Sequence, residues 1–174
     1  MTDTDELPER AVRAFEGHDA FERADGAFEV TTTKFGGRVT AAETEEWALE
    51  YTLTVRAPML SAAVASEAVG DAVEDGWFET YERRLEDAPK ATRIDVELND
   101  LTVRQEDGEA VAAFTFTHGN ADQAPLVAKT FAEYLEGTYA EGIVPGYDYE
   151  GVVEDLIGDA RSQGGSGGGS SMPL

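Results

Sequence analysis

The 174-residue sequence contains no cysteine and only three lysines. Without cysteine the chain cannot form disulfides, thiolate nucleophiles or cysteine-ligated zinc sites. It has no apolar run near the roughly 18 residues that a membrane-spanning helix needs. Its first ten residues are acidic and lack the apolar segment of a signal peptide. We therefore expect a cytoplasmic protein that does not associate with membranes.

Short motifs that signal catalysis, metal binding or phosphate binding are also missing. The sequence has no calcium-binding Asp-x-Asp-x-Asp-Gly loop, no HExxH and no P-loop. One formal match to the nucleophile-elbow pattern, Gly164-x-Ser166-x-Gly168, follows no predicted strand, so we treat it as a chance match. We predict no cofactor and no metal site, and we favour a protein that is not an enzyme.

Basic residues are scarce: 13 Lys and Arg oppose 36 Asp and Glu, which gives a formal net charge of -23. A surface of one sign repels phosphate backbones and anionic lipid, so nucleic acid and membranes are poor partners. The acidic residues run from Asp3 to Asp159 and do not form one tail. Their repulsion weakens in concentrated salt, since the screening length falls from about 10 Å at 0.1 M to about 3 Å at 1 M. We predict a halophilic acidic surface that attracts cations non-specifically; the alternative is an acidic protein with a basic partner.

Apolar and polar residues alternate along several segments, which predicts an antiparallel sheet with one buried face. The clearest strand is Trp47 to Arg56, where every second residue is apolar. A hairpin, or a strand with a lead-in, is predicted around Asp25-Gly26, and a weaker strand over Arg38 to Glu43. Two more strands are predicted from Ile94 to Thr117, with a bulge at Asn99-Asp100.

Helical spacing of apolar residues predicts the remaining elements. Helices are expected after Pro8, from about Asp71 to Leu85, after Pro125, and from Tyr149 to Ser162. The predicted fold is α+β, with about five antiparallel strands in the order α-β-β-β-α-β-β-α(-α) and helices packed on one face. We expect a single domain over residues 1–163 and a flexible Gly/Ser-rich tail over residues 164–174.

Two resemblances accompany this prediction. The element order resembles the secretion-chaperone-like α+β fold, although the two share no motif. Three segments resemble an uncharacterised family of small acidic proteins from salt-loving archaea: LPERAVRAFEGHDAFE (Leu7 to Glu22), DGWFETYERRLEDAPKAT (Asp75 to Thr92) and EGTYAEGIVPGYDYE (Glu136 to Glu150). That family is a domain of unknown function without assigned catalytic residues, so this resemblance implies membership but no activity.

The candidate site residues lie between a strand end and an aromatic turn. His118 follows a predicted strand and could act as a base or ligand, although a lone histidine there more often bonds a loop or helix end. A polar and aromatic group follows the next helix and consists of Tyr139, Tyr147, Asp148 and Tyr149. Tyrosines are enriched at interfaces because they combine apolar area with a hydroxyl group, but here they could equally hold the turn against the core.

Two functional hypotheses follow. The first is a non-enzymatic cytoplasmic binding or assembly module, either a homodimer or the binder of another protein, that uses the sheet face or the turn from Tyr139 to Tyr149. The second is a small-ligand-binding protein or unrecognised enzyme whose pocket is bounded by His118, Tyr139 and Tyr147. An enclosed pocket with convergent polar groups would favour the second hypothesis, whereas a flat apolar patch would favour the first.

Overall fold

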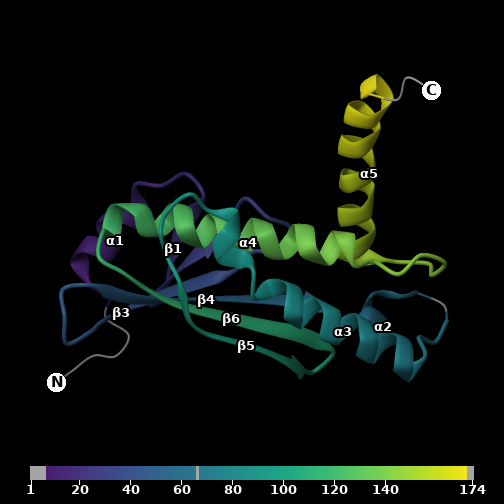
Figure 1. Ribbon diagram of the computed structural model, residues 1–174, viewed down its shortest axis with the longest axis horizontal. Helices are drawn as coiled ribbons and strands as arrows, with labels where there is room; N and C mark the ends of the chain where they lie inside the picture. The colour runs from purple at the N-terminus through teal and green to yellow at the C-terminus, as the bar shows by residue number, and fades with distance from the viewer. Residues whose placement is uncertain (1–6, 66, 172–174) are drawn as a thin grey trace.

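A computed structural model describes residues 7–65 and 67–171, with side chains described as far as Arg161. Six antiparallel strands form one sheet in the order β1-β2-β3-β4-β6-β5. The longest helix that covers the sheet, α4, lies along one face, and α1 lies beside its first half (Figure 1). The α+β fold with an antiparallel sheet is therefore confirmed, with six strands instead of about five.

The strands come in three groups along the chain. Their bounds are β1 Phe21–Ala24, β2 Ala27–Val30, β3 Arg38–Glu43, β4 Leu49–Pro58, β5 Leu98–Glu106 and β6 Glu109–His118. The additional strand comes from the first hairpin, whose two arms pair from Phe21 with Val30 to Ala24 with Ala27. Gly26 has a φ of 68°, which the tight turn between them requires and which glycine adopts without strain.

The helices connect these groups. Their bounds are α1 Glu9–Glu16, α2 Leu60–Ala63, α3 Asp71–Leu85, α4 Ala124–Glu141 and α5 Gly151–Ser171, with short 3-10 turns at Ala88–Ala91 and Ala121–Gln123. Pro125 lies in the first turn of α4, where its missing N–H costs nothing. Among the described residues no helix is long and apolar enough to cross a membrane.

Strands β4 and β6 form the centre of the sheet and pair over ten residues, from Leu49 with His118 to Pro58 with Glu109. Alternate side chains of β4 are fully or almost fully buried, and they pack with Phe114 and Phe116 of β6 under the helices. The predicted bulge is present, because the register of β5 against β6 shifts between Leu98 and Asp100. The period of two therefore fixed which face of β4 is buried.

Three apolar residues that the spacing placed in the core are exposed. Trp47 lies before β4, not in it, and is 73% exposed with the Arg10 guanidinium 3.8 Å from its ring centroid. Val73 on α3 and Leu126 on α4 are 39% and 46% exposed. Trp47 lies two residues before β4, whereas Val73 and Leu126 lie in the first turns of their helices.

The C-terminal helix leaves the body of the protein after its first turns. Val153 is fully buried, whereas the side chains from Gly158 to Arg161 are exposed and α5 projects away from the sheet (Figure 1). Side chains from residue 162 onward and all of residues 172–174 lie outside the described part. The described backbone of residues 164–171, which belong to the tail predicted to be flexible, continues α5, and the flexibility of the tail stays a prediction.

Candidate functional site

Tyr139 lies in the last turns of α4 and is fully buried. Its hydroxyl donates to the carbonyl oxygen of Pro58 over 2.8 Å, which ties α4 to the end of β4. The rings of Trp77 and Tyr81 meet it edge to face at 5.4 and 5.8 Å. Burial raises the pKa of Tyr139 well above its ordinary value, so it stays protonated. Tyr139 belongs to the core and is not accessible to a partner.

The three residues of the predicted turn divide between core and surface. Tyr149 is 8% exposed and its hydroxyl donates to the carbonyl oxygen of Val144, while Tyr147 is half-buried and Asp148 is exposed. Tyr149 forms an antiparallel bridge with Val64, and the backbone carbonyl of Asp148 accepts the N–H of Ala65 at 2.7 Å. The turn is therefore held against the segment that follows α2, and it presents Tyr147 and Asp148 outward.

His118 ends β6 at the opposite end of α4. Its Nε2 lies 2.7 Å from Oε1 of Gln123, the residue that precedes α4. Tyr139 lies 15 residues after Ala124, which corresponds to about 22 Å along the helix. His118 therefore does not share a pocket with Tyr139 and Tyr147, and in the structure it bonds to the entry of a helix.

A pocket of about 260 Å³ lies between α3 and the C-terminal end of α4. Its walls include Gly76, Trp77, Tyr81 and Arg84 from α3, with Gly142 and Val144 after α4. The indole Nε1 of Trp77 and the hydroxyl of Tyr81 are buried and have no hydrogen-bond partner. Buried polar atoms in folded proteins are nearly always paired, so these two are exceptions, although neither atom has accessible surface that opens into the pocket.

The sequence pattern placed Trp77 and Tyr81 in the core, and their burial agrees, but it did not predict a pocket beside them. Trp77 is 5% exposed and Tyr81 is 3% exposed, with their rings stacked at 5.4 Å. The only signal in the sequence was Gly76 within a helical stripe of large residues. α3 passes through Gly76 unbroken, and a Cβ there would meet no atom within 4 Å.

A second, wider hollow lies between α4, α5 and the loop after β2 and has a volume of about 620 Å³. Glu136 on α4 accepts the backbone N–H groups of Lys34 and Phe35 at 2.8 and 3.1 Å, which fixes that loop. Lys34 pairs with Asp159 of α5 at 2.7 Å, and the hydrogen bond to this carboxylate raises the pKa of Lys34. The charged groups that line this hollow therefore connect elements of the fold.

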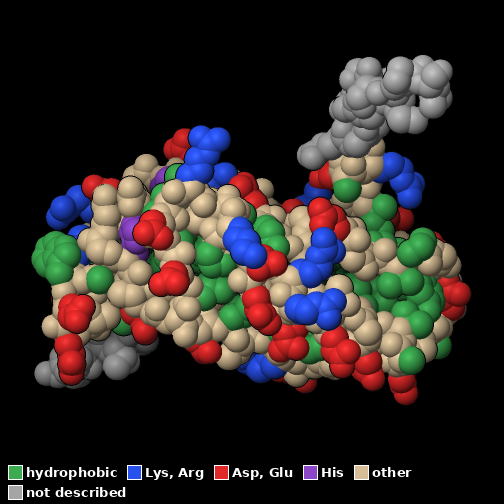
Figure 2. All heavy atoms as spheres, in the orientation of Figure 1, with side chains coloured by type: hydrophobic (Ala, Val, Ile, Leu, Met, Phe, Trp, Pro, Cys, Tyr) green, Lys and Arg blue, Asp and Glu red, His purple; other side chains and the backbone are tan. Residues whose placement is uncertain are grey.

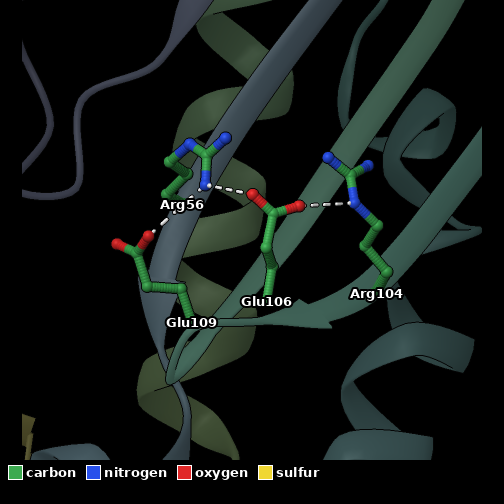
Figure 3. A network of polar contacts seen from close by, with 4 residues as sticks. All are labelled: Arg56, Arg104, Glu106 and Glu109. Carbon is green, nitrogen blue, oxygen red and sulfur yellow. Dashed lines mark hydrogen bonds and ion pairs between the residues drawn. The ribbon is translucent and has the colours of Figure 1, made fainter.

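The sheet face opposite the helices is polar. On β4, β5 and β6, Arg56 lies 3.5 Å from Glu106 and 3.4 Å from Glu109, while Arg104 donates to Glu106 at 3.0 Å (Figure 3). The hydrogen bond from Arg104 lowers the pKa of the Glu106 carboxyl. Because these charges pair with one another and threonines fill much of the remaining face, it resembles a solvated sheet surface more than a docking site.

An exposed apolar surface forms at the end of the molecule where α2 and α3 meet the aromatic turn, and we call it the apolar end. Its exposed or half-buried members are Ala62, Ala65, Val69, Val73, Ile143, Val144, Pro145 and Tyr147. Hydrophobic side chains gather at this end, with acidic side chains along its edge and over much of the remaining visible face (Figure 2). Only this end brings part of the predicted turn together with other exposed apolar residues.

The described residues contain no cluster of three or more His, Asp or Glu side chains placed to hold a metal ion. His118 and Tyr147, the predicted residues with the most reactive side chains still accessible, lie at different ends of the protein. The arrangement therefore offers two features for recognition, the apolar end and the pocket between α3 and α4.

Comparison with known proteins identifies a family for this chain, but that family has no assigned activity. No curated protein and no solved structure shows significant similarity to the chain. One family model matches residues 16–159, which include every strand and most of the helices. The chain belongs to that family, a family of unknown function designated DUF5813.

Proposed function

We propose that this protein is a non-enzymatic cytoplasmic binding module that docks a protein partner on its apolar end. The observation that carries the proposal is an apolar surface left exposed in a chain of formal net charge -23. Contiguous exposed apolar surface is costly in water, and on folded proteins it marks interaction sites. Tyr147 supplies the kind of amphipathic ring that is enriched at such sites.

Hydrogen bonds hold the segments of the apolar end together. The carboxylate of Glu74 on α3 accepts the backbone N–H of Ser61 on α2 at 2.6 Å. The backbone N–H of Glu150 bonds to the carbonyl oxygen of Ala63 at 2.9 Å. These bonds join three segments that are distant in sequence, which supports the proposal that their apolar residues form one surface.

The charge around the apolar end indicates the chemistry of the partner. Exposed carboxylates surround it on several sides, namely Glu67, Asp71, Asp75, Asp148 and Glu150. Two copies of this surface would bring like charges together, whereas a partner with basic residues around an apolar centre would meet complementary charge. We therefore favour a different protein over a homodimer.

Concentrated salt is the setting we propose for this interaction. Screening over about 3 Å at 1 M weakens both the repulsion between exposed carboxylates and their attraction for basic residues at longer range, while charges in direct contact across an interface and apolar contacts persist. A surface rich in acidic residues then stays soluble, attracts cations without dedicated sites, and still leaves the apolar end able to bind. The second candidate, a small-ligand-binding protein or enzyme, requires a pocket other than one bounded by His118, Tyr139 and Tyr147.

The test is affinity capture from a high-salt extract of the source cells with three forms of the protein. The first is the native chain, the second carries Val73→Ser and Tyr147→Ser, and the third carries Leu126→Ser as a matched control on another surface. We expect one protein whose capture falls at least about tenfold with the double variant and is unchanged with the control. Titration of that protein, purified, against the three forms completes the measurement.

Three results would contradict the proposal. Equal capture by all three forms would show that the partner does not bind at the apolar end. If light scattering detects a dimer that the double variant abolishes, the partner is a second copy of the chain. Circular dichroism in dilute buffer and in roughly 2 to 3 M KCl tests the salt requirement. Equal thermal stability in both solutions would contradict the proposed adaptation to salt.

A further inference from the structure

Strand β5 is the last strand on one side of the sheet, and among the described residues no strand pairs with its outer edge. It lies along the lower border of the sheet in Figure 1. The loop that joins β5 to β6 consists of Asp107 and Gly108, whose φ values of 51° and 81° are those of a type I′ turn. Glu106 and Glu109, which flank this turn, therefore form a hydrogen-bonded pair, and such pairs alternate along the ladder.

This alternation determines which backbone groups of β5 face outward. Thr102 and Arg104 bond to β6, whereas the N–H and C=O groups of Leu101, Val103 and Gln105 point away from it. Within residues 7–65 and 67–171, no backbone hydrogen bond outside the ladder involves these three residues. Such an edge is a template for another strand, and proteins often block it with proline or charged side chains. β5 contains no proline, so its charges decide what can pair there.

Two opposite charges on β5 are placed symmetrically about Thr102. Asp100 lies two residues before Thr102 and Arg104 two residues after it, and all three side chains are exposed. Four residues of strand separate the two charges by about 13 Å, so they cannot pair within one copy. Their neighbours across β6 are Thr115 and Val111, which carry no charge. Arg104 contacts a carboxylate only through Nε among the residues drawn in Figure 3.

We propose that two copies of this chain pair through the edge of β5, antiparallel, with Thr102 facing Thr102 at a two-fold axis. This register places Asp100 of each copy opposite Arg104 of the other. It also places Leu101 opposite Val103, with both pairs of backbone hydrogen bonds formed. Because the axis makes each contact twice, one Asp–Arg pair in the sequence gives two in the dimer.

The other registers that keep the backbone bonds are less favourable. Centred on Val103, the pairing would place Asp100 opposite Glu106. Centred on Arg104, it would place two guanidinium groups against each other at the axis, and like charges directly opposite are destabilising. Centred one residue before Thr102, it would give neither charge an ionic partner. The sequence of the strand therefore selects the register centred on Thr102.

This interface differs from the apolar end, because none of residues 100–104 belongs to that surface. The net charge of -23 on each copy opposes association in dilute buffer, and molar salt screens this repulsion while charges in contact persist. Five paired residues from each copy form a smaller interface than that of an obligate dimer. We therefore expect a reversible dimer with a dissociation constant on the order of 10–100 µM.

Sedimentation equilibrium of the full chain in roughly 2 M KCl measures this dissociation constant. Arg104→Asp and Asp100→Arg each turn two attractive pairs into two repulsive ones, so each should weaken the dimer about three- to tenfold. Arg13→Asp, at an exposed position on α1, is the charge-matched control for Arg104→Asp and should leave the dimer unchanged. Mixed in equal amounts, the two β5 variants should associate as tightly as the native chain, because every pair is again Asp with Arg.

Amide hydrogen exchange of the native chain tests the register without any substitution. The N–H groups of Leu101 and Val103 should exchange more slowly above the dissociation constant than below it, because they bond only in the dimer. Those of Thr102 and Arg104 bond to β6 in both states, so their exchange should not depend on concentration. If either β5 variant fails to fold by circular dichroism, this measurement decides the proposal.

Four results would overturn the proposal. The first is a monomer at every concentration up to about 1 mM. The second is a dimer that folded β5 variants do not weaken, or that their mixture does not restore. The third is exchange of Leu101 and Val103 that does not depend on concentration. The fourth is a dimer abolished by Val73→Ser and Tyr147→Ser, which would place the contact at the apolar end.

Discussion

The core contains two aromatic clusters, and they differ in how completely they are closed. The phenylalanine cluster consists of Phe15, Phe21, Phe28, Tyr51 and Phe116, and its rings approach to 4.5 Å between Phe15 and Phe28. The tyrosine–tryptophan cluster consists of Phe35, Trp77, Tyr81 and Tyr139, and it borders the pocket between α3 and α4. Both contain a buried tyrosine hydroxyl without a partner, on Tyr51 and on Tyr81.

The comparison teaches that an unpaired buried hydroxyl alone does not make a site. Tyr51 is fully buried beside Phe116 in a closed cluster, and burial raises its pKa to about 12. Tyr81 has the same chemistry, but its cluster borders a pocket and is therefore less completely closed.

The largest expected difference between the clusters is the stability lost when a central aromatic residue is replaced by alanine. Phe15→Ala should lower the free energy of unfolding by about 3–5 kcal/mol, because it leaves a cavity among closely packed rings. Trp77→Ala should cost less even though tryptophan is larger, since one side of its ring already borders a pocket. Urea unfolding in molar KCl measures both, and a larger loss for Trp77→Ala would contradict the difference in closure.

A smaller difference concerns two hydroxyl groups within the tyrosine–tryptophan cluster. Tyr139→Phe should cost about 1–3 kcal/mol, because it leaves the carbonyl oxygen of Pro58 without its partner. Tyr81→Phe removes a buried hydroxyl that has no partner, so the free energy of unfolding should not fall and should rise by up to about 1–3 kcal/mol. Equal losses in the same urea titrations would show that the Tyr81 hydroxyl is bonded in solution.

The smallest expected effect on stability comes from replacing a single glycine, Gly76 on α3, and we compare it with Gly37, which packs against Leu53 and Val55 of β4. Gly76→Ala should stabilise the protein by up to about 1 kcal/mol, because alanine is the better helix former and meets no atom. Gly37→Ala is the control of opposite sign, since its Cβ would lie 3.1 Å from Leu53 and 3.2 Å from Val30 and Val55. Destabilisation by Gly76→Ala would mean that the pocket is closed in solution.

Most of the sheet could be predicted because its period depends on neighbours along the chain. The alternation in β4, the bulge before Asp100 and the Asp25-Gly26 turn all follow local patterns. Trp47 continues the same alternation but is exposed. A side chain that fits the alternation of a strand is buried only if another segment covers it. Coverage depends on helices that come from other parts of the sequence.

The candidate site could be predicted only in part. Proximity in sequence correctly placed Tyr147, Asp148 and Tyr149 on one turn, but not the fact that Tyr149 and Tyr139 point into the core. His118 was grouped with them although α4 separates it by about 22 Å. The pocket escaped prediction because Gly76 and Gly142 are 66 positions apart and meet only when α3 packs against α4.

By itself, the sequence determined the strongly acidic charge, the absence of thiol chemistry, the α+β class and the division of each strand into a buried and an exposed face. These properties depend on composition or on residues a few positions apart, so they exist before the chain folds. The tertiary structure alone decided which apolar residues stay exposed and which polar atoms are left without partners. Both depend on contacts between segments far apart in sequence, which form only when the chain folds.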